Sequence, residues 1–235
     1  MTNFLDIVEP DDLKNNRLVL ARFNWYNAKG KRPAMFYLKA NDLMSDPAEP
    51  WERSAWFRDE NAYYFNAEGL SLNLAIIGYR ARPFSKAVDA DGKFSRTFEV
   101  EYIPNSGMQF YTEVICLVEG VDEPLIWAAD GMTGAAITEI VRGIHKGLLA
   151  NTRRLAGRRV PLWTYWSAIT AQTDNAGQIV VMKSKAGGEY TPPMLIVPEV
   201  ESLAELEHYY IGDDNYRLCR ELYQQHLDAG WFVKF

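Results

Sequence analysis

The chain has 235 residues, of which 48% are hydrophobic and 24% are charged, and its formal net charge is −6. This composition supports a folded domain with appendages and excludes a disordered or collagen-like chain. No apolar stretch approaches the roughly 18 residues of a membrane-spanning helix. The two cysteines, Cys116 and Cys219, give neither a disulfide framework nor a zinc motif. The N-terminus is acidic where a secretory signal would be basic, so we expect a cytoplasmic protein with no membrane partner.

Residues 1–69 predict an N-terminal β-hairpin extension packed on the core. Leu18–Tyr26 and Ala34–Lys39 favour strands, and Gly30 lies in the turn between them. Asp42–Asp59 is rich in acids and prolines, which is typical of an irregular loop.

A β-rich block follows. Its first strand contains Gly78, which indicates a bulge or a sharp bend. The predicted strands are Leu70–Arg82, Lys93–Tyr102, Met108–Glu119 and Leu125–Ala129.

The hydrophobic period then becomes helical, with Ile137, Ile144 and Leu148 on one face and Thr133 as a candidate N-cap. Two more strands are predicted, over Val160–Ala171 and Gln178–Lys185. A helix between the third and fourth main strands is the order of the five-stranded OB-like Greek-key barrel. We therefore expect a β-rich α+β fold with this barrel over residues 70–198, although other small β-barrels and α+β sheets fit the same elements.

Residues 199–235 predict an acidic C-terminal helical segment. Two amphipathic helices cover Ser202–Ile211 and Asp213–Leu227, and Glu205 completes a capping box with Ser202. Eight acids against three bases give this segment a net charge of −5. We expect its apolar faces to pack on the barrel, while its acids compete with a polyanion for a basic surface or recruit protein partners.

The opposite charge gathers between residues 142 and 185, where eight Lys and Arg stand against one Asp, a local charge of +7. Four arginines (Arg153, Arg154, Arg158 and Arg159) precede the strand that carries Trp163 and Tyr165 on one face. Cations beside flat rings suit single-stranded nucleic acid, because the cations follow the phosphates and the rings stack on bases. The competing interpretations are that the arginines form an ordinary solvated face and that the two aromatic residues pack in the core.

A second basic and aromatic group lies at the end of the first long strand and across its turn. In an OB barrel this loop borders the binding face, so we expect one groove. Its members, with two further lysines downstream, are Arg80, Arg82, Lys93, Phe94, Arg96, Lys183 and Lys185. The hairpin Arg22–Lys39 is a third candidate, for which packing against the barrel is the favoured interpretation.

Catalytic motifs are missing from the sequence, including a nucleophile elbow, a phosphate-binding loop and a zinc-protease helix. His145, His208 and His226 lack metal-ligand spacing. We expect a non-enzymatic protein without cofactor or metal. The alternative is a metal-dependent nuclease that uses a carboxylate cluster of Glu99, Glu101 and Glu113.

The chain resembles single-stranded DNA-binding proteins of bacteriophage and plasmid origin, through Leu70–Arg82, Tyr111–Gly120, Asp130–Leu149, Arg153–Trp166 and Tyr190–Pro193. The resemblance implies an OB barrel with an acidic C-terminal segment. We therefore predict a sequence-independent single-stranded DNA-binding protein of replication or recombination. Its candidate partners are replication or recombination proteins recruited by the acidic C-terminal segment, and further copies of this chain in a homo-oligomer. The alternative is a phage or plasmid interaction or assembly protein.

Overall fold

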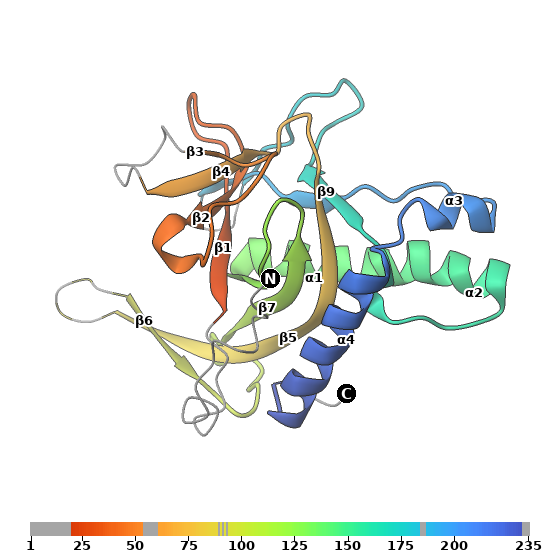
Figure 1. Cartoon of the computed structure of the whole chain (residues 1–235). Coiled ribbons are helices and arrows are strands. Elements are labelled where there is room, and N and C mark those ends of the chain that lie inside the picture. The colour runs from red at the N-terminus through yellow and green to blue at the C-terminus, as the bar shows by residue number, and fades with distance from the viewer. Residues whose placement is uncertain are drawn as a thin grey trace.

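A computed structural model of the chain describes residues 20–53, 61–88, 90, 92, 94–183 and 187–231. In these residues ten strands form one mixed sheet, in the order β12-β9-β5-β7-β8-β1-β2-β4-β3, with β6 paired to the far end of β5 (Figure 1). The strands of this sheet are β1 (Ala21–Tyr26), β2 (Met35–Lys39), β3 (Glu52–Arg53), β4 (Ala62–Asn66), β5 (Leu72–Val88), β6 (Phe94–Phe98), β7 (Gln109–Val118), β8 (Leu125–Asp130), β9 (Ser167–Ala171) and β12 (Pro193–Leu195). A separate pair joins β10 (Met182–Lys183) to β11 (Glu189–Tyr190).

The prediction of a closed five-stranded OB barrel is wrong. The sheet is open and has ten strands, because β1, β2, β3 and β4 of the N-terminal region belong to it. The predicted hairpin does form, as β1 and β2 pair antiparallel with Phe23 opposite Leu38. Strand β1 also pairs in parallel with β8, so the hairpin extends the sheet and is not a layer packed against it. A parallel pairing between strands so distant in sequence leaves no local signal that sequence reasoning can use.

Strand β5 is the longest strand of the sheet and pairs with three others. It pairs with β7 along most of its length, with β9 at its start and with β6 at its end. The register with β7 shifts between Ile76 and Gly78, which confirms the predicted bulge at Gly78. The bulge lets the strand bend, and Figure 1 shows β5 curving around the molecule.

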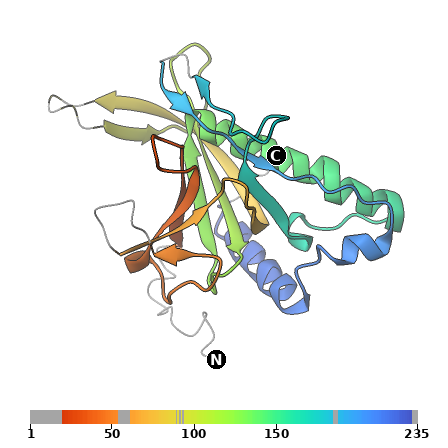
Figure 2. The same ribbon diagram turned by 90° about the horizontal axis from the view of Figure 1, so that it is seen from above.

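The predicted helix is confirmed, but its N-cap is Asp130 and not Thr133, and the helical chain continues to Ala156. Helix α1 (Gly131–Ile144) continues through a π-helical turn (η4, His145–Leu149) into α2 (Ala150–Ala156), as one long rod in Figure 2. The extended chain that includes β12 crosses this rod closely. A Cβ on Gly143 would lie 2.8 Å from Leu195 Cδ2, so glycine permits the approach.

The C-terminal segment forms the two predicted helices, α3 (Leu203–Glu207) and α4 (Asp213–Asp228). The capping box is present: Ser202 accepts a hydrogen bond from Glu205 N, and the Glu205 side chain returns to the Ser202 backbone. Short 3-10 turns occur at η3 (Ala40–Asp42) and η5 (Leu162–Thr164).

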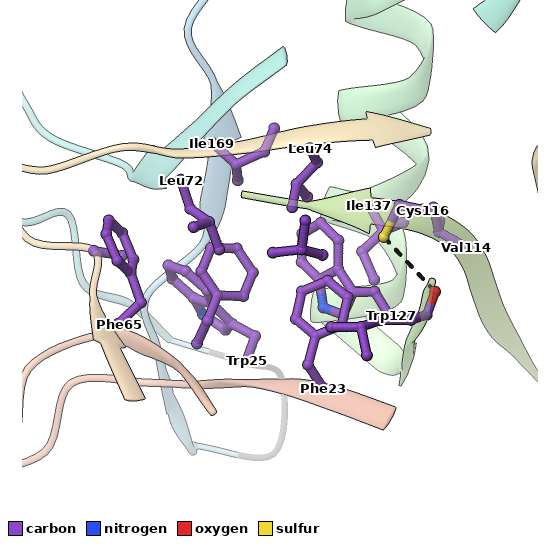
Figure 3. Close-up of a cluster of buried hydrophobic side chains, with 14 of the residues drawn as sticks. Phe23, Trp25, Phe65, Leu72, Leu74, Val114, Cys116, Trp127, Ile137 and Ile169 are labelled. Carbon is purple, nitrogen blue, oxygen red and sulfur yellow. Dashed lines mark hydrogen bonds between the residues drawn. The ribbon is translucent and has the colours of Figure 1, made fainter. Parts of the chain in front are cut away.

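Two apolar layers hold the sheet, one on each face. Alternation along β7 sends Val114 and Cys116 to the inner layer and Ile115 and Leu117 to the outer one. Figure 3 shows the inner layer, where Trp127 is fully buried among aromatic and aliphatic side chains of the sheet and of α1. Helix α4 covers the outer layer. Within the described residues, no helix has the length and apolar character that crossing a membrane requires.

Candidate nucleic-acid interface

An ion-pair cluster lies on the outer face of the sheet, beside Phe84 and Tyr111 of the outer apolar layer. The Glu113 side chain is only 2% exposed and is held by two arginines. Arg80 Nε lies 2.8 Å from Glu113 Oε2, and Arg82 Nη2 lies 2.8 Å from the same oxygen. Within the described residues, these two guanidinium groups and one carboxylate have a formal charge of +1.

A second carboxylate, Asp130, repeats this arrangement nearby. Arg96 Nη2 lies 2.9 Å from Asp130 Oδ2, and Lys86 Nζ lies 3.7 Å from the same oxygen. These side chains are between a quarter and two-fifths exposed. Asp130 is thus shared by two cations, as Glu113 is.

Aromatic rings lie under these cations. The Arg82 guanidinium lies 3.9 Å from the centre of the Phe98 ring, and that of Arg96 lies 5.1 Å from the centre of Tyr111. Arg22 of β1 donates to the Tyr111 hydroxyl at 3.3 Å. We call this surface the basic-aromatic face, and its residues are Arg22, Arg80, Arg82, Phe84, Lys86, Arg96, Phe98, Tyr111, Glu113 and Asp130.

Strand alternation explains why these residues meet. After the bulge, Arg80, Arg82, Phe84 and Lys86 occupy every second position of β5, so they share one face. The paired strands supply partners in register, with Glu113 opposite Arg80 and Arg96 opposite Lys86. Five cations against two carboxylates leave the face with a net charge of +3.

The end of α4 covers one edge of this face. The Arg80 guanidinium lies 4.1 Å from the centre of the Trp231 ring and donates to the Trp231 carbonyl at 3.4 Å. Burial lowers the pKa of His226, and the charge of Arg80 lowers it further. The acidic segment therefore contacts the basic-aromatic face through a tryptophan. Among the described residues, Asp214 is the acid of this segment that forms a salt bridge, and its partner is Arg217 within α4.

The predicted site residues separate into several places. Arg80, Arg82 and Arg96 come together on the basic-aromatic face, and Phe94 begins β6. Lys93 and Lys185 lie outside the described residues. Lys183 is exposed on β10.

The four arginines of the +7 segment form a second basic region. Arg153 and Arg154 are exposed in α2, and Arg158 and Arg159 are exposed just after it. Arg154 also donates to the Val200 carbonyl at 2.8 Å. Figures 1 and 2 place α2 and the β5–β6 ribbon at opposite ends of the molecule, so the two regions do not line one groove.

Trp163 and Tyr165 are buried, at 7% exposure each, so the expectation that they offer rings to bases needs correction. The predicted strand over Val160–Ala171 begins only at Ser167, because Leu162–Thr164 form a 3-10 turn. Strand alternation therefore does not apply there. Trp163 packs under α4, 4.9 Å from Tyr223, and the Tyr165 hydroxyl accepts a hydrogen bond from Thr152.

The alternative carboxylate cluster does not assemble. Glu113 is engaged by two arginines, and Glu99 accepts a hydrogen bond from Ser85. The described part of the chain contains no group of three or more His, Cys, Asp or Glu arranged to hold a metal ion.

Sequence reasoning left Lys86, Tyr111 and Asp130 out of the candidate site, and placed Arg22 only in the weaker hairpin candidate. For Lys86 a signal existed, since it continues the every-second-residue pattern of Arg80 and Arg82. Arg22 reaches the face only through the parallel pairing of β1 with β8. Comparisons with protein-family models, with curated proteins and with solved structures give no match to this chain.

Proposed function

We propose that this protein binds single-stranded DNA on the basic-aromatic face, without sequence preference and without catalysis. The observation that carries the proposal is the sharing of Glu113 and Asp130 among four cations that lie over aromatic rings. Phosphates are the natural further ligands of such cations. Phe98, which is 40% exposed, offers a ring beside them.

The arginines themselves supply a second kind of contact. Unpaired bases stack on guanidinium planes as well as on aromatic rings. The acidic partners fix the orientation of these planes, because the hydrogen bonds of a guanidinium to a carboxylate lie in its plane. A strand that follows β5 would therefore meet arginines that can both bind its phosphates and stack on its bases.

The test is a titration of the full chain with oligo-dT, followed by tryptophan fluorescence over a series of salt concentrations. With about four phosphate contacts, the slope of log affinity against log salt is about −2.8, at about −0.7 per contact. In the double variant Lys86→Gln/Arg96→Gln we expect a slope weaker by about 1.4, from two lost contacts.

The matched control is Arg142→Gln/Arg217→Gln, which removes two exposed arginines that pair within their own helices. We expect its affinity to stay near that of the wild type. A flat salt response of the wild type, equal affinity for duplex DNA, or equal losses in both double variants would contradict the proposal.

A second candidate function is protein interaction, and the connection between β6 and β7 favours it. This segment exposes large apolar side chains, with Val100 at 99%, Ile103 at 57% and Tyr102 at 45% exposure. Exposed apolar groups that gather in one segment are typical of interaction sites. If they join copies of this chain, sedimentation will show an oligomer that Val100→Asp/Ile103→Asp converts to a monomer. Without oligonucleotide binding, such an oligomer would favour this second function.

A further inference from the structure

A pocket at the tip of the β1–β2 hairpin has no part in the proposed function. Its volume is ≈ 330 Å³, which is at the lower end of the range for small-molecule sites. It is lined by Trp25, Tyr26, Asn27, Ala28, Lys29, Arg32 and Glu189, none of which belongs to the basic-aromatic face.

The walls of this pocket are held by hydrogen bonds between distant parts of the chain. Trp25 Nε1 donates to the Thr191 carbonyl at 2.8 Å, and Asn27 Oδ1 accepts from Thr191 N at 3.1 Å. These contacts tie the hairpin to the segment after Glu189, although some 160 residues separate them in sequence. The pocket is therefore built by the fold, and its lining does not depend on a single loop.

Two basic residues, the exposed Lys29 and the half-buried Arg32, pair across the turn of the hairpin through their backbones. Lys29 N donates to Arg32 O at 2.9 Å, and Arg32 N donates to Lys29 O at 3.1 Å, so the two residues form an antiparallel bridge. Like charges directly opposite each other destabilise such a pair. An anion bound between them would remove this repulsion.

Arg32 is also incompletely satisfied. Its guanidinium lies 5.3 Å from the centre of the Tyr26 ring and donates to the Asn27 carbonyl at 3.1 Å. Its Nε is buried and has no hydrogen-bond acceptor among the described residues. A buried charged donor without an acceptor is unfavourable and calls for a bound water or ion.

Glu189 does not supply the missing negative charge. It lines the same pocket and is exposed on β11, and within the described part of the chain no salt bridge joins it to Lys29 or Arg32. The pocket therefore has a net charge of +1, with two cations on one wall and one carboxylate.

We infer that this pocket binds a phosphate group, held by Arg32 and Lys29. Guanidinium and ammonium groups are the common protein ligands of phosphate, and a planar guanidinium can donate to two of its oxygens. The volume admits more than the phosphate alone, so the group belongs to a larger molecule. It comes either from a free nucleotide or from the 5′ end of a nucleic-acid strand.

The experiment measures binding of inorganic phosphate, of dTMP and of oligo-dT with and without a 5′ phosphate, by calorimetry on the full chain. Saturable binding of dTMP identifies a free nucleotide. Tighter binding of the 5′-phosphorylated oligonucleotide than of its unphosphorylated form identifies a strand end. Either result supports the inference. If neither is observed, the inference is overturned.

The variant Lys29→Gln/Arg32→Gln should weaken this binding by about tenfold or more, since two charge-assisted contacts are lost. The matched control is Lys31→Gln, which removes a cation from the same turn that does not line the pocket. If Lys31→Gln weakens binding equally, the loss reflects the overall positive charge of the turn and not contacts in the pocket, and the inference is overturned. Lys86→Gln/Arg96→Gln changes the basic-aromatic face and leaves this pocket intact. This variant therefore tests the proposed single-strand binding separately from phosphate binding in the pocket.

Discussion

The role of a side chain in this protein depends on burial more than on residue type. Trp163 and Trp231 are both tryptophans near basic segments, yet Trp163 is buried under α4 and Trp231 lies over Arg80. Glu113, which by type suits a metal or a solvated face, is instead buried as the shared partner of two arginines. Removing Glu113 would leave two partly buried guanidinium groups without their shared carboxylate, so we expect this position to tolerate substitution poorly.

His226 gives a pH dependence whose direction follows from its surroundings. Burial lowers its pKa most, the hydrogen bond that Nδ1 donates to the Leu222 carbonyl at 2.8 Å raises it, and the charge of Arg80 lowers it again. The balance lowers the pKa, so the folded protein favours the neutral ring. The unfolded chain binds the proton more readily. The stabilisation is therefore complete above the ordinary histidine pKa of about 6.5 and is lost as the pH falls below it.

We expect His226→Gln to flatten the decrease in unfolding free energy between about pH 7.5 and pH 5.5, as measured by urea denaturation. The matched control is His208→Gln, since His208 is exposed on the neighbouring helical segment. A wild-type pH profile retained in His226→Gln would show that other groups cause the dependence.

At the scale of elements, two long segments are each divided between different environments. The first half of β5 packs in the two apolar layers, and its second half carries the basic-aromatic face. The helical rod from α1 to α2 likewise begins against the sheet and ends in the exposed arginines. The connection from β8 into α1 is tight, because Gly134 lies against the last residues of β8.

This close approach predicts the effect of alanine at two helical glycines. Alanine in place of glycine ordinarily stabilises a helix by about 1 kcal/mol. A Cβ on Gly134 would lie 2.8 Å from the Ala129 backbone carbonyl, so we expect Gly134→Ala to destabilise the protein by about 1–3 kcal/mol.

At Gly143 the neighbour is the end of the flexible Leu195 side chain, which can move. Gly143→Ala should therefore be close to neutral. Urea denaturation of both variants tests this order of stability, and a Gly134→Ala protein as stable as the wild type would contradict it.

At the scale of the whole molecule, two basic regions, the basic-aromatic face and the arginines in and after α2, lie at opposite ends (Figures 1 and 2). The net charge of −6 conceals both, since the acids lie mainly elsewhere in the chain. A strand bound along the basic-aromatic face does not need the arginines around α2. Electrostatic attraction between exposed charges fades within about 10 Å at moderate salt, so the distant region contributes little.

We therefore expect Arg158→Gln/Arg159→Gln to change oligo-dT affinity less than twofold, in contrast to Lys86→Gln/Arg96→Gln. Both double variants remove two positive charges, so each serves as the control of the other. The measurement is the same fluorescence titration at low salt. Comparable losses would mean that one strand contacts both regions, or that α2 carries the interface.

The sequence by itself determined the local features of this protein. The hairpin of β1 and β2, the bulge at Gly78, the helix with Ile137 on its buried face and the capping box of Ser202 and Glu205 all follow from patterns within some 20 residues. Turn chemistry, hydrophobic period and capping act over such distances, so they can be recognised in the chain itself.

Only the tertiary structure decided the open ten-stranded sheet and the members of the candidate site. The parallel pairing of β1 with β8 brought Arg22 to the basic-aromatic face, and a 3-10 turn where a strand was expected buried Trp163 and Tyr165. The phosphate pocket likewise needs Glu189 beside a hairpin at the other end of the chain. Pairing and burial between distant segments depend on how all the apolar faces fit together, and no local pattern encodes that fit.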